Sequence, residues 1–151
     1  PMFKFDDKEI RALEKAAKIV KSKLNTNLVI DSPVVVSDFL KYKLVHQPRE
    51  VFAVIFLNAQ HGIIEYRELF VGTIDSCSVY PSEIFKMALK LNSKAIVISH
   101  QHPSGSPEPS QSDITITKRI CEGANLLDIK VLDHILVAGD KTVSFAERGL
   151  L

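Results

Sequence analysis

Two histidines, a serine and an aspartate stand at fixed intervals in the middle of the chain. The segment begins His100-Gln101-His102, and Ser110 and Asp113 follow it. Side chains alternate between the two faces of an extended strand, so His100 and His102 should point to the same side and reach one ion. A carboxylate at Asp113 could supply a third ligand and leave a fourth position for water, as in catalytic zinc sites. The pattern therefore favours a zinc centre.

Each of these residues also has an ordinary structural explanation. Histidines that end a strand can simply be polar groups, one of them bonded to the backbone. Ser110 is a good helix N-cap, a role that contributes about 1 kcal/mol, and Ser110-Gln111-Ser112-Asp113 has the form of a capping box. A first-turn carboxylate is favoured by the helix dipole. The two roles of Asp113 are compatible, because the cap can hold the carboxylate while its other oxygen reaches the ion.

The spacing H-x-H-x7-S-x2-D resembles the JAMM (JAB1/MPN) metalloprotease motif. The flanking sequences SHQHPSGSPEPSQSD and LDHILVAGDKTVSFAERGLL are similar to the bacterial RadC branch of that superfamily, in particular to its short members without a helix-hairpin-helix region. The resemblance runs from about residue 32 to the end of the chain. It implies that His100, His102 and Asp113 bind zinc and that Ser110 lies beside the reacting centre. One departure is Gln101, where relatives usually carry Asn; its side chain should point away from the metal.

Hydrolysis at such a site needs a base that takes a proton from water and returns it to the leaving amine. The resemblance implies a glutamate at the start of an early strand, and Glu50 directly precedes the apolar run VFAVIFL. Glu65 and Glu68 are competing candidates, although both stand in a strand whose polar positions can face solvent. The alternative for Glu50 is a solvated charge or an ion pair with Arg49.

Zinc-dependent hydrolysis of a peptide or isopeptide bond is the activity that the resemblance implies. Glu50 would activate the zinc-bound water, Ser110 would stabilise the tetrahedral intermediate, and no further cofactor is required. The expected partner is a peptide or protein substrate, whose identity the sequence does not specify, and the oligomeric state is equally open. A zinc nucleoside deaminase is disfavoured because it needs H-x-E together with P-C-x-x-C.

Two other classes of function remain as alternatives. The RadC family is historically associated with DNA repair, and single-strand nucleases with a His-x-His pair also use a catalytic tyrosine, for which Tyr42, Tyr66 and Tyr80 are available. The residue between the two histidines is hydrophobic in such nucleases, whereas Gln101 in this chain is polar. The third class is a non-catalytic interaction module, as in superfamily members that have lost metal ligands.

The composition is that of one globular domain. The 151 residues include 19 Lys and Arg against 18 Asp and Glu, a formal charge of +1, so charge argues weakly against nucleic acid as the main partner. Cys77 and Cys121 form no CxxC pair, which suits buried thiols in a reducing compartment. The charged first residues predict no signal peptide, and no apolar run is long enough to span a membrane. We therefore expect a cytoplasmic protein with no membrane partner.

Helical periodicity over residues 7–24 predicts an amphipathic helix. A turn or linker is expected at residues 31–33, followed by a short helix that Ser37 or Asp38 would cap and that would end at Leu44. We therefore divide the chain into an N-terminal helix and linker, residues 1–31, and a RadC-like JAMM/MPN metalloprotease domain, residues 32–151.

The remaining pattern alternates strands and helices. Strands are expected at residues 51–57, 63–71 and 94–99, with a possible strand at 76–80 and a terminal hairpin of 129–138 with 142–145. Helices are expected at 83–91 and from Ser110 to about residue 127. This predicts a three-layer α/β/α fold with a mixed sheet, similar to the cytidine-deaminase-like layout of JAMM domains. His134 should be buried and hydrogen-bonded, or a partner of the site, whereas His46 and His61 are given no role.

Overall fold

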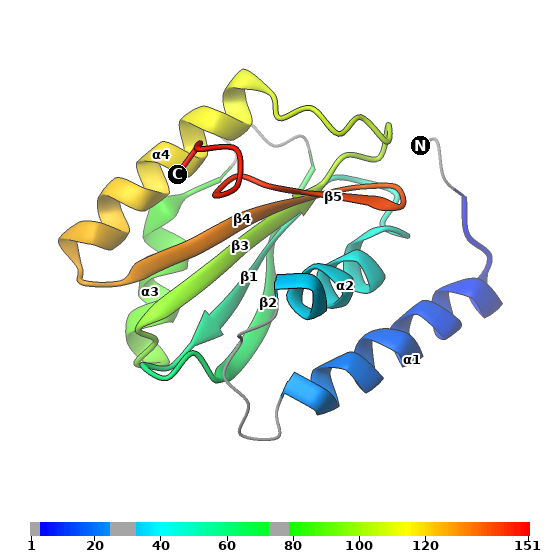
Figure 1. The fold of residues 1–151 in the computed structure, drawn as a ribbon, viewed down its shortest axis with the longest axis horizontal. Helices are drawn as coiled ribbons and strands as arrows, with labels where there is room; N and C mark the ends of the chain where they lie inside the picture. Colours follow the sequence, from blue (N-terminus) through cyan, green and yellow to red (C-terminus); the bar gives the residue numbers. More distant parts are fainter. Residues whose placement is uncertain (1–3, 25–32, 73–78) are drawn as a thin grey trace.

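The computed structural model describes residues 4–24, 33–72 and 79–151. A five-stranded sheet crosses the molecule with helices on both of its faces (Figure 1). The strand order is β2-β1-β3-β4-β5. Among the strands of the described residues, only β3 and β4 are parallel to each other, and the other three pairings are antiparallel. The predicted α/β/α fold with a mixed sheet is confirmed.

The two central strands are buried on both sides, as their continuous apolar sequences predict. The strands are β1 (Val51–Leu57), β2 (Ile63–Val71), β3 (Ala95–Gln101), β4 (Lys130–Ala138) and β5 (Lys141–Ser144). The strand predicted at residues 94–99 thus runs on to Gln101, so that His100 lies within it and His102 directly follows it. This places both histidines at the carboxyl end of β3.

Within the described ranges, four helices form the outer layers of the fold. They are α1 (Asp7–Leu24), α2 (Pro33–Leu44), α3 (Pro81–Lys90) and α4 (Gln111–Leu126). Figure 1 shows α1 and α2 on one side of the sheet and α3 and α4 on the other. One hydrophobic core joins α1 and α2 to the sheet, and a second core joins α3 and α4 to its opposite face. The helix predicted at residues 7–24 therefore packs on the domain, where Ala17 is buried.

The start of α2 corrects one prediction. This helix begins at Pro33, not after a cap at Ser37 or Asp38. Proline suits the first turn of a helix because its fixed φ is helical and its missing N–H has no helical acceptor. The β-branched residues that follow lower the helix propensity, but burial of Val36 and Phe39 in the core stabilises the helical conformation.

Some predictions concern residues that the structure does not describe. Residues 31 and 32 of the predicted turn and residues 76–78 of the possible strand lie outside the described ranges, as does Cys77. The last two residues of that possible strand, Val79 and Tyr80, belong to no strand. Cys121 is a free thiol and is partly buried on α4. None of the helices in the described ranges combines the length and the apolar character needed to cross a bilayer.

Candidate metal centre

The two histidines and the aspartate converge where β3 ends and α4 begins. His100 Nε2 lies 3.1 Å from Asp113 Oδ1, and His102 Nε2 lies 3.0 Å from Asp113 Oδ2. The two Nε2 atoms are 3.2 Å apart. His100 is fully buried and Asp113 nearly so, whereas His102 is partly exposed. Within residues 4–24, 33–72 and 79–151, this is the one group of three or more such side chains that could hold a metal ion.

The first turn of α4 holds the carboxylate in place through the predicted capping box. Asp113 N–H donates to Ser110 Oγ at 3.0 Å, and Ser110 N–H donates to Asp113 Oδ2 at 2.8 Å. Ser110 is exposed; its Oγ accepts from Asp113 N–H, and among the described residues no acceptor is bonded to its hydroxyl proton. The cap therefore fixes Asp113 and leaves one O–H on Ser110 available to donate.

The loop after β3 determines which ring nitrogen of His102 carries a lone pair toward the centre. His102 Nδ1 lies 2.9 Å from the carbonyl oxygen of Ser106. A carbonyl can only accept, so Nδ1 must carry the proton and donate. In the neutral ring, Nε2 then presents its lone pair to Asp113 and His100.

A chain of buried hydrogen bonds determines which ring nitrogen of His100 carries the lone pair. Thr117 Oγ1 lies 2.6 Å from the carbonyl oxygen of Asp113 and 2.6 Å from His134 Nδ1. The hydroxyl must donate to the carbonyl, so His134 Nδ1–H donates to the hydroxyl oxygen. His134 Nε2 then accepts from His100 Nδ1–H, at 2.7 Å. His100 is left with its lone pair on Nε2, which faces Asp113.

Burial keeps His134 in the neutral form that this chain of bonds requires. Desolvation lowers the pKa of His134 well below its ordinary value, and the neighbouring His100 lowers it further. The ring stacks on Phe145, with 4.2 Å between the centroids. His134 is therefore a buried, hydrogen-bonded histidine as predicted, and it is also the direct hydrogen-bond partner of His100.

The resulting donor set matches what a cation requires. The Nε2 atoms of His100 and His102 and the oxygens of the Asp113 carboxylate lie 3.0–3.2 Å from one another. All of these atoms present lone pairs, so a single proton placed between two of them would satisfy only one of the three contacts. A tetrahedral zinc ion with bonds of about 2.0–2.1 Å holds its ligands about 3.3–3.4 Å apart. The three side chains thus fit zinc after an opening of a few tenths of an ångström, with their other polar atoms already bonded by neighbouring residues.

Electrostatics in the cluster also favour an ionised carboxylate. Burial alone would raise the pKa of Asp113, but His100 and His102 in their protonated forms donate to it, and together with the Ser110 N–H they hold that pKa well below its usual range. Burial acts to lower the pKa of His102, while Asp113 and the Ser106 carbonyl raise it to a net value above the ordinary one. Asp113 is therefore a carboxylate across the neutral pH range, which is the form that binds a metal.

Replacing Thr117 with valine should weaken zinc binding by about 10–100-fold, the usual effect of disturbing the hydrogen bonds that support a metal ligand, because Thr117 holds His134 and His134 holds His100. Without the hydroxyl, His134 Nδ1–H loses its acceptor, which favours the tautomer protonated on Nε2. His100 must then accept on Nδ1 and carry its own proton on Nε2, where it blocks the ion. Competition with a zinc chelator measures the affinity. Thr117→Ser keeps the hydroxyl and should bind like wild type, and equal affinity in Thr117→Val would contradict the hydrogen-bond chain.

The sheet register places Glu50 at the same end of the fold. Phe52 pairs with His100 in the antiparallel β1–β3 ladder, so continuing that register by two residues sets Glu50 opposite His102. Its carboxylate is near enough to contribute to raising the pKa of His102, and the residue is partly buried. Its backbone carbonyl accepts from Gly72 N–H at 2.8 Å. Of the three glutamates considered, Glu50 is the one beside the histidines.

Gln101 holds the backbone on both sides of Glu50. Its Oε1 accepts from Val51 N–H at 2.7 Å, and its Nε2 donates to the carbonyl oxygens of Arg49 and Gln47. This side chain is buried and alternates with His100 along β3, so it points away from the metal cluster, as predicted. Its amide thereby fixes the segment that carries Glu50.

The two competing glutamates, Glu65 and Glu68, lie on β2, away from the histidine cluster. Glu68 pairs with Ala53 and accepts from Tyr66 Oη–H at 2.9 Å. Glu65 pairs with Phe56, near the other end of β1 from Glu50, and binds Arg67. Neither carboxylate contacts the histidine cluster. The Glu65–Arg67 and Glu68–Tyr66 pairs thus account for these polar positions of β2.

The tyrosines that a nuclease mechanism would need are not in the cluster. Tyr42 and Tyr66 pack against the core on the α1/α2 face of the sheet, while the Phe52 ring beside His100 belongs to the opposite core. Tyr80 is exposed and contacts Phe70. Among the described residues, no tyrosine is hydrogen-bonded to the histidines.

Of the features that support the cluster, Thr117 was not anticipated from the sequence, and a role for His134 beside the site was expected only as an alternative. Thr117 stands four residues after Asp113, one helical turn away, which is a spacing that could have flagged it. The contact between His134 and His100 depends on the parallel pairing of β3 with β4, in which Ile98 lies beside His134 and Leu136 beside His100. No local pattern encodes that register, so only the folded sheet brings the two rings together.

Known proteins resemble this chain over most of its length. The family described as RadC-like JAB domain matches residues 30–150. A UPF0758 protein of Vibrio cholerae is 47% identical over 143 residues, covering 95% of this chain and 90% of the relative. A UPF0758 protein of Cellvibrio japonicus is 48% identical over 139 residues, but the matched region is only 62% of its length. The chain belongs to the RadC-like JAB domain family.

Proposed function

We propose that the chain is a zinc-dependent hydrolase that cuts a peptide or isopeptide bond. The observation that carries this proposal is the convergence of the His100 and His102 lone pairs with the Asp113 carboxylate. Three protein ligands leave a coordination position for water or substrate, which distinguishes catalytic from structural zinc sites. Membership of a JAB domain family supports the same reaction class, although the names of the relatives describe no reaction.

Zinc is the metal that this donor set suits best. Imidazole nitrogen favours zinc and later transition metals, whereas Mg²⁺ and Ca²⁺ prefer sets made only of oxygen ligands. Two neutral imidazoles and one carboxylate match the ligand types of known catalytic zinc sites. The hydrogen bonds to Ser106 and His134 orient both rings before any metal binds.

Each residue around the cluster has a definite task in the proposed reaction. When bound, zinc would polarise the substrate carbonyl and acidify water at the open position. The Glu50 carboxylate would accept a proton from the water that adds to the carbonyl carbon, and would deliver that proton to the amine nitrogen as the C–N bond breaks. Ser110 O–H would donate a hydrogen bond to the carbonyl oxygen as negative charge develops there.

A library of mixed-sequence peptides, supplemented with peptides joined through a lysine Nε, tests this proposal without a known substrate. Hydrolysis of either bond releases a new primary amine that can be labelled and counted. We expect amine release by the zinc-loaded chain, its loss when a chelator removes zinc, and its return when zinc is restored. Equal release with and without zinc, or none from either class of peptide, would contradict the proposal.

A further inference from the structure

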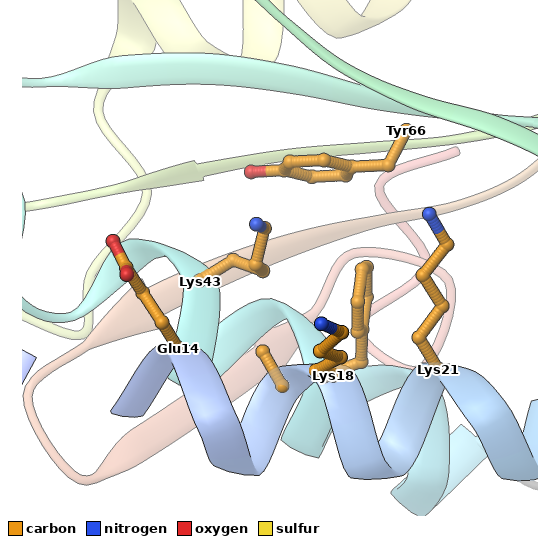
Figure 2. Close-up of a pocket in the computed structure, with 7 residues that line it drawn as sticks. Glu14, Lys18, Lys21, Lys43 and Tyr66 are labelled. Carbon is orange, nitrogen blue, oxygen red and sulfur yellow. The ribbon is translucent and has the colours of Figure 1, made fainter. Parts of the chain in front are cut away.

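A pocket lies between α1, α2 and the sheet. It encloses about 360 Å³ and is lined by Glu14, Ala17, Lys18, Lys21, Phe39, Lys43 and Tyr66. We call this set of residues the lysine pocket (Figure 2). Its volume falls in the range of small-molecule sites.

The sheet separates the lysine pocket from the metal cluster. Tyr66 pairs with Ile55, and both belong to the core on the α1/α2 face. His100 pairs with Phe52, which belongs to the core on the α3/α4 face. The lysine pocket therefore lies on the other face of the sheet from the metal cluster at which hydrolysis is proposed.

Positive charge is concentrated in the lysine pocket. Its lining includes three lysines and one glutamate, so its formal charge is three minus one, or +2. Figure 2 shows Lys18 and Lys21 rising from α1, and Lys43 extending beneath the Tyr66 ring. Within the part of the chain that the structure describes, none of these three ammonium groups forms an ion pair. Like charges gathered around one cavity repel each other, and a bound anion would relieve that repulsion.

The wall opposite α1 is aromatic. Phe39 and Tyr66 meet edge to face, with 5.4 Å between their centroids. Burial raises the pKa of Tyr66, so its hydroxyl stays protonated, and it donates to Glu68. Lys43 Nζ lies 5.2 Å from the centre of the Tyr66 ring, a cation–π contact that positions one ammonium group over an apolar surface. The lysine pocket thus offers charge and an aromatic surface side by side.

We propose that the lysine pocket binds a small phosphate monoester whose organic part packs against Tyr66. A phosphate monoester carries a charge of about −1.5 to −2 at neutral pH, which matches the +2 of the lining. Lysine ammonium groups bind phosphate as point charges. Figure 2 shows Glu14 at the opposite end of the pocket from Lys21, so the phosphate lies toward Lys18 and Lys21 and away from the carboxylate.

Phenylphosphonate is a suitable probe because it joins a dianionic head to one aromatic ring and resists hydrolysis. It should shift the backbone amide NMR signals of residues that line the lysine pocket, and it should bind more tightly than either inorganic phosphate or benzyl alcohol. In Lys18→Ala/Lys21→Ala, its affinity should fall at least about tenfold, as expected when two charged contacts to phosphate are lost. Lys43→Met, on the other helix, should also weaken binding.

The matched control removes the same charge from the same helix outside the lysine pocket. Lys8→Ala/Lys15→Ala changes two exposed lysines of α1 that do not line it, and phenylphosphonate should bind this variant as it binds wild type. Thermal unfolding of each variant checks that α1 still packs. Equal affinity in all variants, or equal affinity for inorganic phosphate and phenylphosphonate, would overturn the proposal. So would an oligonucleotide that binds the same lysines more tightly than the probe.

Discussion

A chain carrying His100→Ala and His102→Ala should lose its zinc. Wild type is expected to hold about one ion per chain, and the double variant less than about a tenth of that, because zinc needs several deprotonated ligands at once. Asp113 alone would remain, on a helix start where the Ser110 N–H already donates to Oδ2. Elemental analysis after dialysis against a metal-free buffer measures the stoichiometry.

The matched control for this variant removes two histidines elsewhere. His46→Ala/His61→Asn changes residues outside the cluster, and asparagine is chosen for His61 because its φ of 64° is one that asparagine tolerates. This control should retain zinc. Asp113→Asn keeps the size of the side chain and an acceptor for the helix cap, so it tests the ligand set with little change in packing. Zinc bound equally by all these chains would show that the cluster is not the metal site.

Zinc should also stabilise the wild-type fold, since a ligand that binds only the native state raises its stability. The midpoint of thermal unfolding should therefore rise with added zinc in wild type and in the His46→Ala/His61→Asn control, and should not change in His100→Ala/His102→Ala. This comparison separates loss of the site from loss of the fold, because a variant that unfolds at the same temperature as the metal-free wild type has kept its structure.

The elements and the cluster could be predicted because they depend on short-range pattern. The alternation of β3 brings His100 and His102 to one face, and the capping box at Ser110 positions Asp113 within one turn of a helix. The start of α2 was placed too late, since its valines disfavour a helix locally and the core stabilises one there. Tertiary packing decided that boundary, and the local sequence could not reveal it.

The support around the cluster could not be predicted because it depends on contacts between distant strands. His134 reaches His100 through the parallel β3–β4 pairing, and Gln101 reaches the backbone beside Glu50 through the antiparallel β1–β3 pairing. Sequence patterns predict that strands exist, but register is set by the whole sheet. The same contacts explain why a glutamate more than forty residues before the histidines can be brought beside them.

Replacing Glu50 with glutamine should lower kcat for zinc-dependent hydrolysis by about 10²–10⁴-fold, the contribution usual for a general acid–base residue. Glutamine has nearly the same size and can still form hydrogen bonds, but it cannot take a proton from water. Zinc content and KM should stay close to the wild-type values, because Glu50 is not among the three ligands. A peptide cleaved in the library assay provides the substrate for this measurement.

The two alternative glutamates provide the controls for this prediction. Glu65→Gln and Glu68→Gln make the same chemical change on β2, where the carboxylates bind Arg67 and Tyr66 instead of facing the cluster. Both variants should hydrolyse the peptide at nearly the wild-type rate. A large loss of hydrolysis rate in either variant, with Glu50→Gln fully active, would assign the proton transfer to a glutamate of β2 instead of Glu50. Since that strand places Glu65 near the far end of β1 and Glu68 beside Tyr66, such a result would also require substrate to bind away from the metal ligands.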